Sequence, residues 1–425
     1  MKKIAIVILA MTATLGVAQE QGQKMDNFYT QIKDAKNTFE APKDTVTTFE
    51  KVNVGLGGAF ALQYQAISHE NTAAPVIVND VNTNQLYDIG NNFNLATANL
   101  DLNVALYDGV NLHLRTFLSS RHHNEAYVKG GFLQIDKLDF VEKGFLENFM
   151  KYATIKIGHN EINYGDAHFR RSDNANALTN PFVGNLLMDA YATMVFAEVY
   201  YRRDGWIAMI GATNGRLNQN ANSGTSPSIY AKIGYDKQIN TDLRIRLTGS
   251  VYNVAETKRT DFYDGDRAGA RYYYVMENTA ATSTANFRSG QVLPGFTNKL
   301  TTVMINPFVK YKGFEFFGTY ENAGGRTTAE TNRRTFQQYA AELLYRFGTD
   351  EKLYFGGRYN GVTGKTIAGE SVDITRFNIG GGWFMTRNIL VKMEYVNQKY
   401  DGYATTNILN GGKFNGFMAE AAIAF

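Results

Sequence analysis

Hydrophobic and polar residues alternate with a period of two along most of the chain between residues 52 and 425. The stretch 338–347 is representative. One side of it carries Tyr339, Ala341, Leu343, Tyr345 and Phe347, and the other carries Gln338, Glu342 and Arg346. Successive side chains of a strand point to opposite faces, so this pattern predicts strands with one apolar and one polar face.

About sixteen such segments follow one another, and their connections alternate in length. Short turns lie near Asp108, Asp204, Asp236, Lys312, Gly348 and Arg387. Longer polar loops lie at 69–92, 214–227, 253–298, 322–332, 362–371 and 398–412. We therefore predict an all-β fold, a transmembrane antiparallel β-barrel of about 16 strands with short periplasmic turns and long extracellular loops. One connection, 138–150, contains apolar residues at helical spacing and predicts a short amphipathic helix on the turn side.

A soluble all-β protein is the alternative, because the strands of sandwiches also alternate. Sandwich strands usually contain about five or six residues. Several segments here reach ten or more, close to the length of a tilted membrane crossing. Aromatic residues such as Tyr64, Tyr201, Trp206 and Trp383 fall at strand ends, where a membrane interface favours them. The pattern favours the membrane barrel.

The N-terminus has the features of a secretory signal peptide over residues 1–18. Lys2 and Lys3 precede an apolar run, and Gly16-Val17-Ala18 is a small-x-small cleavage site. A membrane helix is the alternative, but the run is too short for one. Residues 19–50 are polar and form either a leader or a plug helix. The barrel is expected over residues 51–425 and closes with the terminal strand paired to the strand that begins near Val52.

The composition agrees with an exported barrel. The chain has no cysteine, 26 Tyr, 28 Phe, 40 Gly and only 6 Pro, which favours strands and aromatic girdles over helices. Mean hydropathy is −0.30. The formal net charge is +3, and two of the positive charges are lysines of the predicted signal peptide. The mature chain is nearly neutral, and we expect outer-membrane lipid rather than nucleic acid as its partner.

Charged residues gather on the polar strand face, which points into the barrel. The basic candidates for lining the pore are Arg115, Lys156, Lys232, Arg244, Arg246, Arg346, Arg358 and Arg376. They would screen permeating solutes in a water-filled lumen. Carboxylates stand against them in similar number, so most of these charges are expected to pair across neighbouring strands. Arg244 and Arg246, two apart on one face, are the best candidates for a basic ladder and for a mild anion preference.

The segment 159–190 is long and rich in Asn, Asp and Arg. Long loops in compact domains are more often functional than idle. Folded into the lumen, it would narrow the pore and place Asp166, Arg170, Arg171 and Asp173 at the constriction. The alternative is a surface loop exposed to solvent.

Enzymatic signals are weak. Neither a G-x-S-x-G nor an H-E-x-x-H motif is present in the sequence. His159 and His168 lie near Asp166 and Asp173, which leaves a hydrolytic site as an alternative. We assign no catalytic, cofactor-binding or metal-binding residue, expect no cofactor, and do not expect an enzyme.

The repeated hairpins, the run Lys156-Ile157-Gly158-His159-Asn160 and the terminal Ala422-Ile423-Ala424-Phe425 resemble those of bacterial outer-membrane porins. The likeness is greatest to the Bacteroidota-type porins, with a distant one to the phosphate-selective porin O and P group, whose lysine cluster finds no match here. The resemblance implies an outer-membrane passive diffusion channel for small hydrophilic solutes or ions. It also implies that Phe425 belongs to the signal read by the barrel-assembly machinery, that segment 166–185 folds inward, and that the protein is a homotrimer. A hydrolase barrel, or a structural or adhesive barrel that uses loop 253–298, are the other hypotheses.

Overall fold

The computed structural model describes residues 39, 40, 43, 49–94, 96–119, 126–214, 226–257, 260–263, 271–282 and 288–425. The predicted signal peptide and most of the predicted leader lie outside the described residues. Among the residues described, no helix has both the length and the apolar character needed to cross a membrane.

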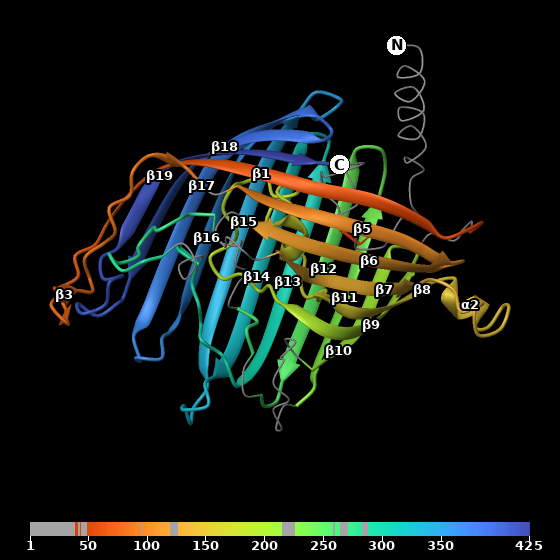
Figure 1. The fold of residues 1–425 in the computed structure, drawn as a ribbon, viewed down its shortest axis with the longest axis horizontal. Coiled ribbons are helices and arrows are strands. Elements are labelled where there is room, and N and C mark those ends of the chain that lie inside the picture. The colour runs from red at the N-terminus through yellow and green to blue at the C-terminus, as the bar shows by residue number, and fades with distance from the viewer. Residues whose placement is uncertain are drawn as a thin grey trace, which may run out of the picture.

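Sixteen antiparallel strands form a closed barrel, as predicted (Figure 1). In chain order they are β1 (Asn53–Glu70), β5 (Thr97–Tyr107), β6 (Val110–Ser119), β7 (Ala126–Ile135), β8 (Ala153–Glu161), β9 (Thr193–Arg203), β10 (Trp206–Thr213), β11 (Ser228–Gln238), β12 (Leu243–Val254), β13 (Lys299–Tyr311), β14 (Phe314–Arg326), β15 (Arg334–Phe347), β16 (Leu353–Lys365), β17 (Ser371–Thr386), β18 (Ile389–Asp401) and β19 (Lys413–Ala424). The two-residue strand β4 (Asn92–Phe93) also pairs with β1, and β2 (Ile77–Val78) pairs with β3 (Val81–Asn82) in a separate hairpin.

The two faces of each strand differ as the period of two requires. Along β15, buried and exposed residues alternate at every position. Glu342 and Arg346 point inward, and Leu343 and Tyr345 point outward. The polar face of the sequence pattern is therefore the inner face of the barrel.

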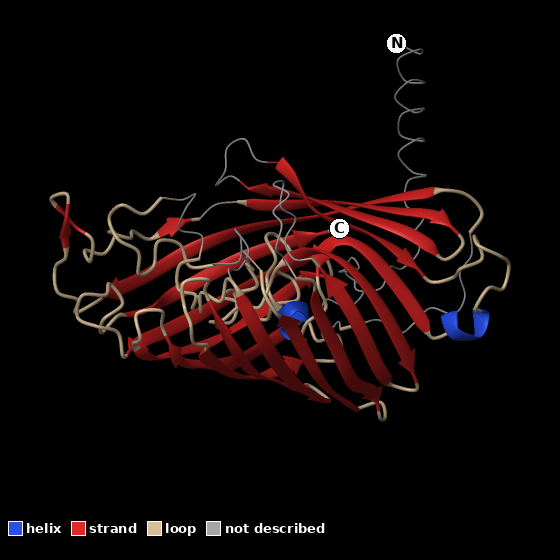
Figure 2. Ribbon diagram, turned by 90° about the horizontal axis from the view of Figure 1, so that it is seen from below, coloured by secondary structure: helices blue, strands red, loops and turns tan. Residues whose placement is uncertain are grey.

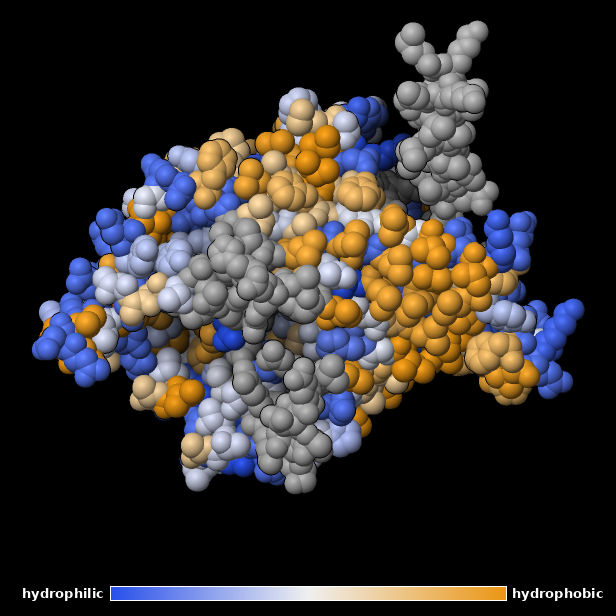
Figure 3. All heavy atoms as spheres, in the orientation of Figure 1, coloured by the Kyte–Doolittle hydropathy of each residue, from blue (hydrophilic) through white to orange (hydrophobic). Residues whose placement is uncertain are grey.

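Large apolar side chains cover the outer face. Examples from around the barrel are Ile210, Ile233, Leu247, Leu343, Met393 and Phe417, each more than half exposed. Figure 3 shows such residues gathered into a continuous patch on the side of the molecule it displays. A contiguous apolar surface of this kind is unfavourable in water and is suited to lipid. The predicted location in the bacterial outer membrane agrees with this surface and with the fold.

Short turns and long loops lie at opposite ends of the barrel. The turn between β9 and β10 consists of Asp204 and Gly205, both with positive φ (54° and 88°), which is the backbone of a tight hairpin. Helix α2 (Glu147–Met150) lies at this turn end, as expected for the 138–150 connection, and the β2–β3 hairpin lies at the other end (Figure 1).

The last strand closes the barrel against the first. β19 pairs with β1, with Ala424 opposite Ala59. Phe425 donates its backbone N–H to the Gly58 carbonyl, and Gly58 donates its own to the Phe425 carbonyl, both at 3.0 Å. The expected pairing of the terminal strand with the strand that begins near Val52 is correct.

Strand β7 has no counterpart among the segments recognised in the sequence. Gly130 and Gly131 interrupt its alternation, and its register with β6 shifts between Arg115 and Thr116. An irregularity of this kind breaks the period of two, which is why the pattern does not reveal the strand.

Candidate functional site

The segment between β8 and β9 lies inside the barrel. Its short helix η1 (Ala167–Arg170) appears within the ring of strands in Figure 2. Backbone N–H groups of Val183 and Gly184 donate to the Glu394 carboxylate on β18, at 2.8 and 3.2 Å. The N–H of Leu187 donates to Asn360 on β16 at 2.7 Å. We call residues 162–192 the inward segment, because polar side chains of the barrel wall hold its backbone across the lumen.

Arg170 of the inward segment anchors in a row of alternating charges. Its guanidinium contacts Glu315 at 2.7 Å and Glu342 at 3.1 Å. Behind these carboxylates, Arg346 contacts Glu315 at 2.7 Å and Arg358 contacts Glu342 at 2.9 Å. All five side chains are nearly inaccessible to solvent. Arg346 and Arg358 thus pair with neighbouring strands, as expected, but the inward segment covers them, so they are buried rather than hydrated.

Asp166 lies in a second buried cluster. Lys232 Nζ contacts Asp166 Oδ1 and Glu40 Oε1, both at 2.7 Å, and Arg246 contacts the same two carboxylates. Burial by itself would raise the pKa of both carboxyl groups. The Arg246 guanidinium and Lys232 ammonium nevertheless hold the pKa of Glu40 well below its usual range and lower that of Asp166. Both carboxylates are therefore charged and bound at neutral pH.

Arg244 and Arg246 share one carboxylate. Asp236 accepts from Arg244 at 2.7 Å and from Arg246 at 3.0 Å. Because Arg246 is also bound to Asp166, neither side chain presents an unbalanced positive charge to the lumen. The two residues form part of an ion-pair cluster, not the open basic ladder that their spacing suggested.

Two residues that precede the barrel lie within its turn-side interior. The Phe39 ring packs against Phe169, Phe308 and Phe317, with the first two centroids at 5.9 and 5.1 Å. Glu40 joins the Asp166 cluster. Phe39 and Glu40 of the 19–50 segment therefore lie within the lumen, and whether that segment is a leader or a plug stays a prediction.

A second segment enters the barrel from the opposite end. Tyr272 donates to Glu394 at 2.7 Å, and Arg271 contacts Glu420. Arg376 of β17 donates to the carbonyls of Asn185 and Gly290, each at 2.6 Å, and so ties both segments to the wall. Arg271 and Tyr272 of loop 253–298 therefore contact inward-facing residues of the wall, and the hypothesis that this loop binds partners stays a prediction.

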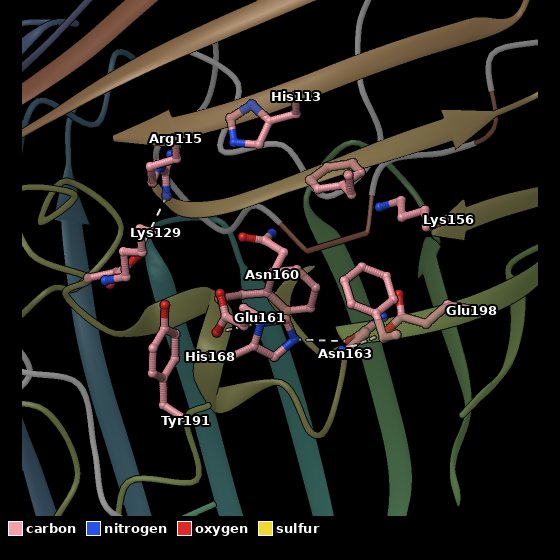
Figure 4. A pocket seen from close by; sticks show the side chains of 14 residues that line it. His113, Arg115, Lys129, Lys156, Asn160, Glu161, Asn163, His168, Tyr191 and Glu198 are labelled. Carbon is pink, nitrogen blue, oxygen red and sulfur yellow. Dashed lines mark hydrogen bonds and ion pairs between the residues drawn. The ribbon is translucent and has the colours of Figure 1, made fainter. Parts of the chain in front are cut away.

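A narrow cavity remains between the inward segment and strands β6 to β9 (Figure 4). The volume within it that a water-sized molecule can reach is about 30 Å³. Its charged lining residues are Arg115, Lys129, Lys156, Glu161, Asp173 and Glu198, with aromatic rings between them. The three basic residues lie on adjacent strands β6, β7 and β8, and Asp173 comes from the inward segment.

The carboxylates of the cavity are held by donors. Asp173 contacts Lys129, and it also contacts Arg115 at 3.5 Å and Arg171 at 3.8 Å. Glu198 accepts from the Tyr200 and Tyr230 hydroxyls at 2.6 and 2.8 Å. Lys156 Nζ lies 5.3 Å from the centre of the Phe132 ring and 5.0 Å from that of Tyr200.

The candidate residues thus divide into two groups. Arg115, Lys156 and Asp173 line the cavity. Arg171 binds Asp189 within the inward segment at 2.6 Å, and it contacts Asp173 and the Tyr191 ring, both of which line the cavity. The others lie in the buried clusters described above: Asp166, Arg170, Lys232, Arg244, Arg246, Arg346, Arg358 and Arg376. Lys129 was missed in the sequence because β7 was missed.

His168 was the residue on which a hydrolytic site depended. Its Nδ1 lies 3.2 Å from Glu161, and its Nε2 lies 2.9 Å from the Asn163 amide oxygen. The fourteen described residues that line the cavity include no serine, threonine or cysteine that the imidazole could activate. Over the part of the chain that the structure describes, no group of three or more His, Cys, Asp or Glu could hold a metal ion.

The chain matches no protein-family model and no curated protein. Among solved structures it is similar to OmpT, an outer membrane protein of Vibrio cholerae, with a TM-score of 0.51 and 13% identity over 89% of this chain and 99% of that one. The outer membrane channel DcaP of Acinetobacter baumannii gives a TM-score of 0.51 at 10% identity, over 89% of this chain and all of that one.

An anion-selective porin from Comamonas acidovorans also has a TM-score of 0.51 and 10% identity, over 88% of this chain and 100% of that one. At such identities the likeness concerns architecture, and the likeness to Bacteroidota-type or phosphate-selective porins stays a prediction. The fold of this chain is that of the bacterial outer-membrane β-barrels.

Proposed function

We propose that this protein is an outer-membrane channel through which small hydrophilic solutes or ions diffuse passively. The observation that carries the proposal is a closed barrel with an apolar outer face and a polar, charged interior, narrowed by a segment folded into it. A solute would pass the cavity between the inward segment and strands β6 to β9, where Arg115, Lys156 and Asp173 are the pore-lining residues. The similar folds of the channel DcaP and of an anion-selective porin support this proposal.

Planar-bilayer recording tests the proposal directly. The purified, folded protein is expected to give stepwise conductance increments. These increments should be small, because buried side chains fill most of the lumen. The same preparation after heat unfolding is the control. A folded, membrane-inserted barrel that produces no steps would contradict the channel function.

A mild preference for anions is the second part of the proposal. Arg115, Lys129 and Lys156 lie together on one wall of the cavity. Because Arg115 is paired with Asp101 and Lys129 with Asp173, we expect the preference to depend chiefly on Lys156. Under a KCl gradient, we expect the reversal potential to show that chloride is more permeable than potassium. Lys156→Gln should reduce this preference roughly fivefold at most, because one charge contributes on the order of 1 kcal/mol at such a site.

The exposed turn residue Lys352 provides the matched control for this experiment. Its side chain is 59% exposed and lies outside the cavity, so Lys352→Gln should leave the reversal potential unchanged. A preference for potassium in the unaltered protein would contradict the anion proposal, although it would leave the channel function intact.

We propose a homotrimer embedded in outer-membrane lipid. One solved structure of the similar OmpT is described as a trimer form. The mass of the protein in detergent, measured by light scattering, distinguishes a trimer from a monomer. We also propose that residues 1–18 are removed as a signal peptide, which N-terminal sequencing of the exported protein would test.

Phe425 is proposed as part of the signal for the barrel-assembly machinery. It follows β19 directly, and its backbone seals β19 against β1 at Gly58. Its side chain is 60% exposed on the outer face, so it contributes little to packing within the barrel. Phe425→Ser should therefore lower the amount of assembled barrel in cells, measured by heat-modifiable migration, while the purified variant still refolds in detergent. Equal refolding and cellular yields for variant and parent would contradict this role.

A further inference from the structure

The connection between β7 and β8 projects sideways from the turn end of the barrel, where Figure 1 labels α2. We call residues 138–152 the rim loop. It contains α2 and has no role in the interior cavity. Whether the loop lies on the outer or the inner face of the barrel wall determines whether it can contact lipid or the lumen.

The rim loop packs on the outer side of the barrel wall. Met150 is buried against Ile135 of β7 and Ala153 of β8, and Leu138 packs on the same cluster. Ile135 of β7 pairs with Ile155 of β8. The residues adjacent to them in sequence, Gln134 and Lys156, are buried and point inward. Ile135 and Ile155 therefore face outward, and the loop rests against the surface that continues into the apolar belt.

Aromatic contacts extend this attachment to β9. The Phe149 ring stacks on Tyr201, with centroids 6.2 Å apart and planes 28° from parallel, and the Tyr152 ring lies 5.7 Å from Tyr201. Tyr201 faces outward, because its neighbour Tyr200 points inward and donates to Glu198. The rim loop is thus continuous with the outer face of three strands.

Large apolar side chains of the loop are exposed beside the charged residues Glu142, Lys143 and Glu147. Five large side chains are between 42% and 60% exposed: Phe140, Val141, Phe145, Leu146 and Phe149. Their concentration within ten consecutive residues is far greater than the scattered apolar residues normal on a surface in water.

Hydrogen bonds within the loop hold these side chains in place. Gly144 donates its N–H to the Asp139 carboxylate at 3.0 Å, and Phe145 donates to the Glu142 carbonyl at 2.9 Å. Met150 donates to the Leu146 carbonyl at 2.9 Å. The apolar surface therefore belongs to an ordered element.

We propose that the rim loop is an interfacial anchor, which inserts Phe140, Val141, Phe145 and Leu146 into membrane lipid at the turn-side interface. The loop continues the lipid-facing surface of β7, β8 and β9. Trp206, on the adjacent strand β10, lies exposed at the same end and packs on Tyr235 at 5.2 Å, an arrangement typical of a membrane interface. An amphipathic element of this kind lies in the plane of the interface, with its charged residues toward water.

The absence of cysteine from the sequence makes a clean test available. A nitroxide label is attached to Phe145→Cys, and in a second variant to Leu146→Cys, with each protein reconstituted in phosphatidylcholine vesicles. Collisions with lipid-soluble oxygen and with a water-soluble nickel complex are measured by electron paramagnetic resonance. Leu343→Cys on the apolar belt serves as the lipid reference, and Asp350→Cys on an exposed turn serves as the water reference.

We expect both rim-loop labels to match the Leu343 reference, with frequent oxygen collisions and few nickel collisions. Values that match the Asp350 reference would overturn the proposal, because the loop would then lie in water. Protection from both reagents would also overturn it, since the loop would then be covered by protein, such as a second copy of this chain. If the Leu343 label itself reports water, the membrane location underlying the proposed channel fails, which is a distinguishable result.

Discussion

Replacing residues 166–189 with a short Gly-Ser linker is expected to raise single-channel conductance by at least about fivefold, because a barrel of sixteen strands without a lumen segment encloses a wide aqueous channel. The replaced residues fill the middle of the lumen and connect to the wall on many sides. Examples are Arg170 to Glu315, Asp173 to Lys129 and Gly184 to Glu394. Planar-bilayer recording measures the change.

The matched control shortens the loop between β14 and β15, whose residues Thr328 and Ala329 are exposed and lie outside the lumen. Its conductance should equal that of the parent. Heat-modifiable migration confirms that each variant is folded. A folded deletion variant with parental conductance would show that the inward segment does not limit the passage.

A milder variant guards against a failure of the deletion to fold. Glu394→Leu removes the acceptor of the Val183 and Gly184 N–H groups, along with that of the Tyr272 hydroxyl. Buried donors without an acceptor are costly, so both lumen segments should loosen. We expect frequent transitions between conductance levels that the parent does not show. Steady parental conductance in this variant would argue against a constriction held by Glu394.

The barrel itself could be predicted because its signal is local. A strand such as β15 shows the period of two at every position, and the turn Asp204-Gly205 is a hairpin signal in two residues. The same reasoning failed at β7, where two glycines and a register shift break the period. Alternation in the sequence therefore reveals the regular strands, but it does not reveal β7, in which the alternation is interrupted.

The contents of the lumen were harder to predict, because they depend on contacts between residues far apart in the chain. The composition of 159–190 indicated a functional loop, and four of its charged residues were named. The partners of these residues could not be predicted. Arg170 binds Glu315 and Glu342, which lie 145 and 172 positions away on strands that only the closed barrel brings together. A strand pattern tells that Arg346 and Arg358 face inward, but it cannot tell that a loop covers them.

The basic ladder shows the same limit. The spacing of Arg244 and Arg246 correctly puts both on the inner face of β12. The carboxylates that balance them come from β11, from the inward segment and from residue 40. Charge at a site is the sum over all elements that meet there, so a count along one strand overestimates the field a solute would meet.

Arg246→Met is expected to lower the free energy of unfolding by about 3 to 5 kcal/mol, the usual result when one partner of a buried ion pair is removed. The guanidinium is wholly buried and contacts Asp166, Glu40 and Asp236. Lys232 alone would then face Asp166 and Glu40, which are close enough to repel each other. Equilibrium unfolding in guanidinium chloride, followed by heat-modifiable migration, measures the loss.

The double variant Arg246→Met/Asp166→Asn separates this electrostatic cause from a loss of packing. Removal of one negative charge leaves Lys232 and Glu40 as a balanced pair, so the double variant should recover part of the stability lost in Arg246→Met. If the effects of the two substitutions simply add, Arg246 stabilises the barrel through packing on Phe39, whose ring centre lies 4.4 Å from the guanidinium carbon. Recovery would instead show that the charges of Asp166 and Arg246 fasten the inward segment to the wall. The double variant should then also give steadier single-channel currents than Arg246→Met, since the element that narrows the passage would be held again.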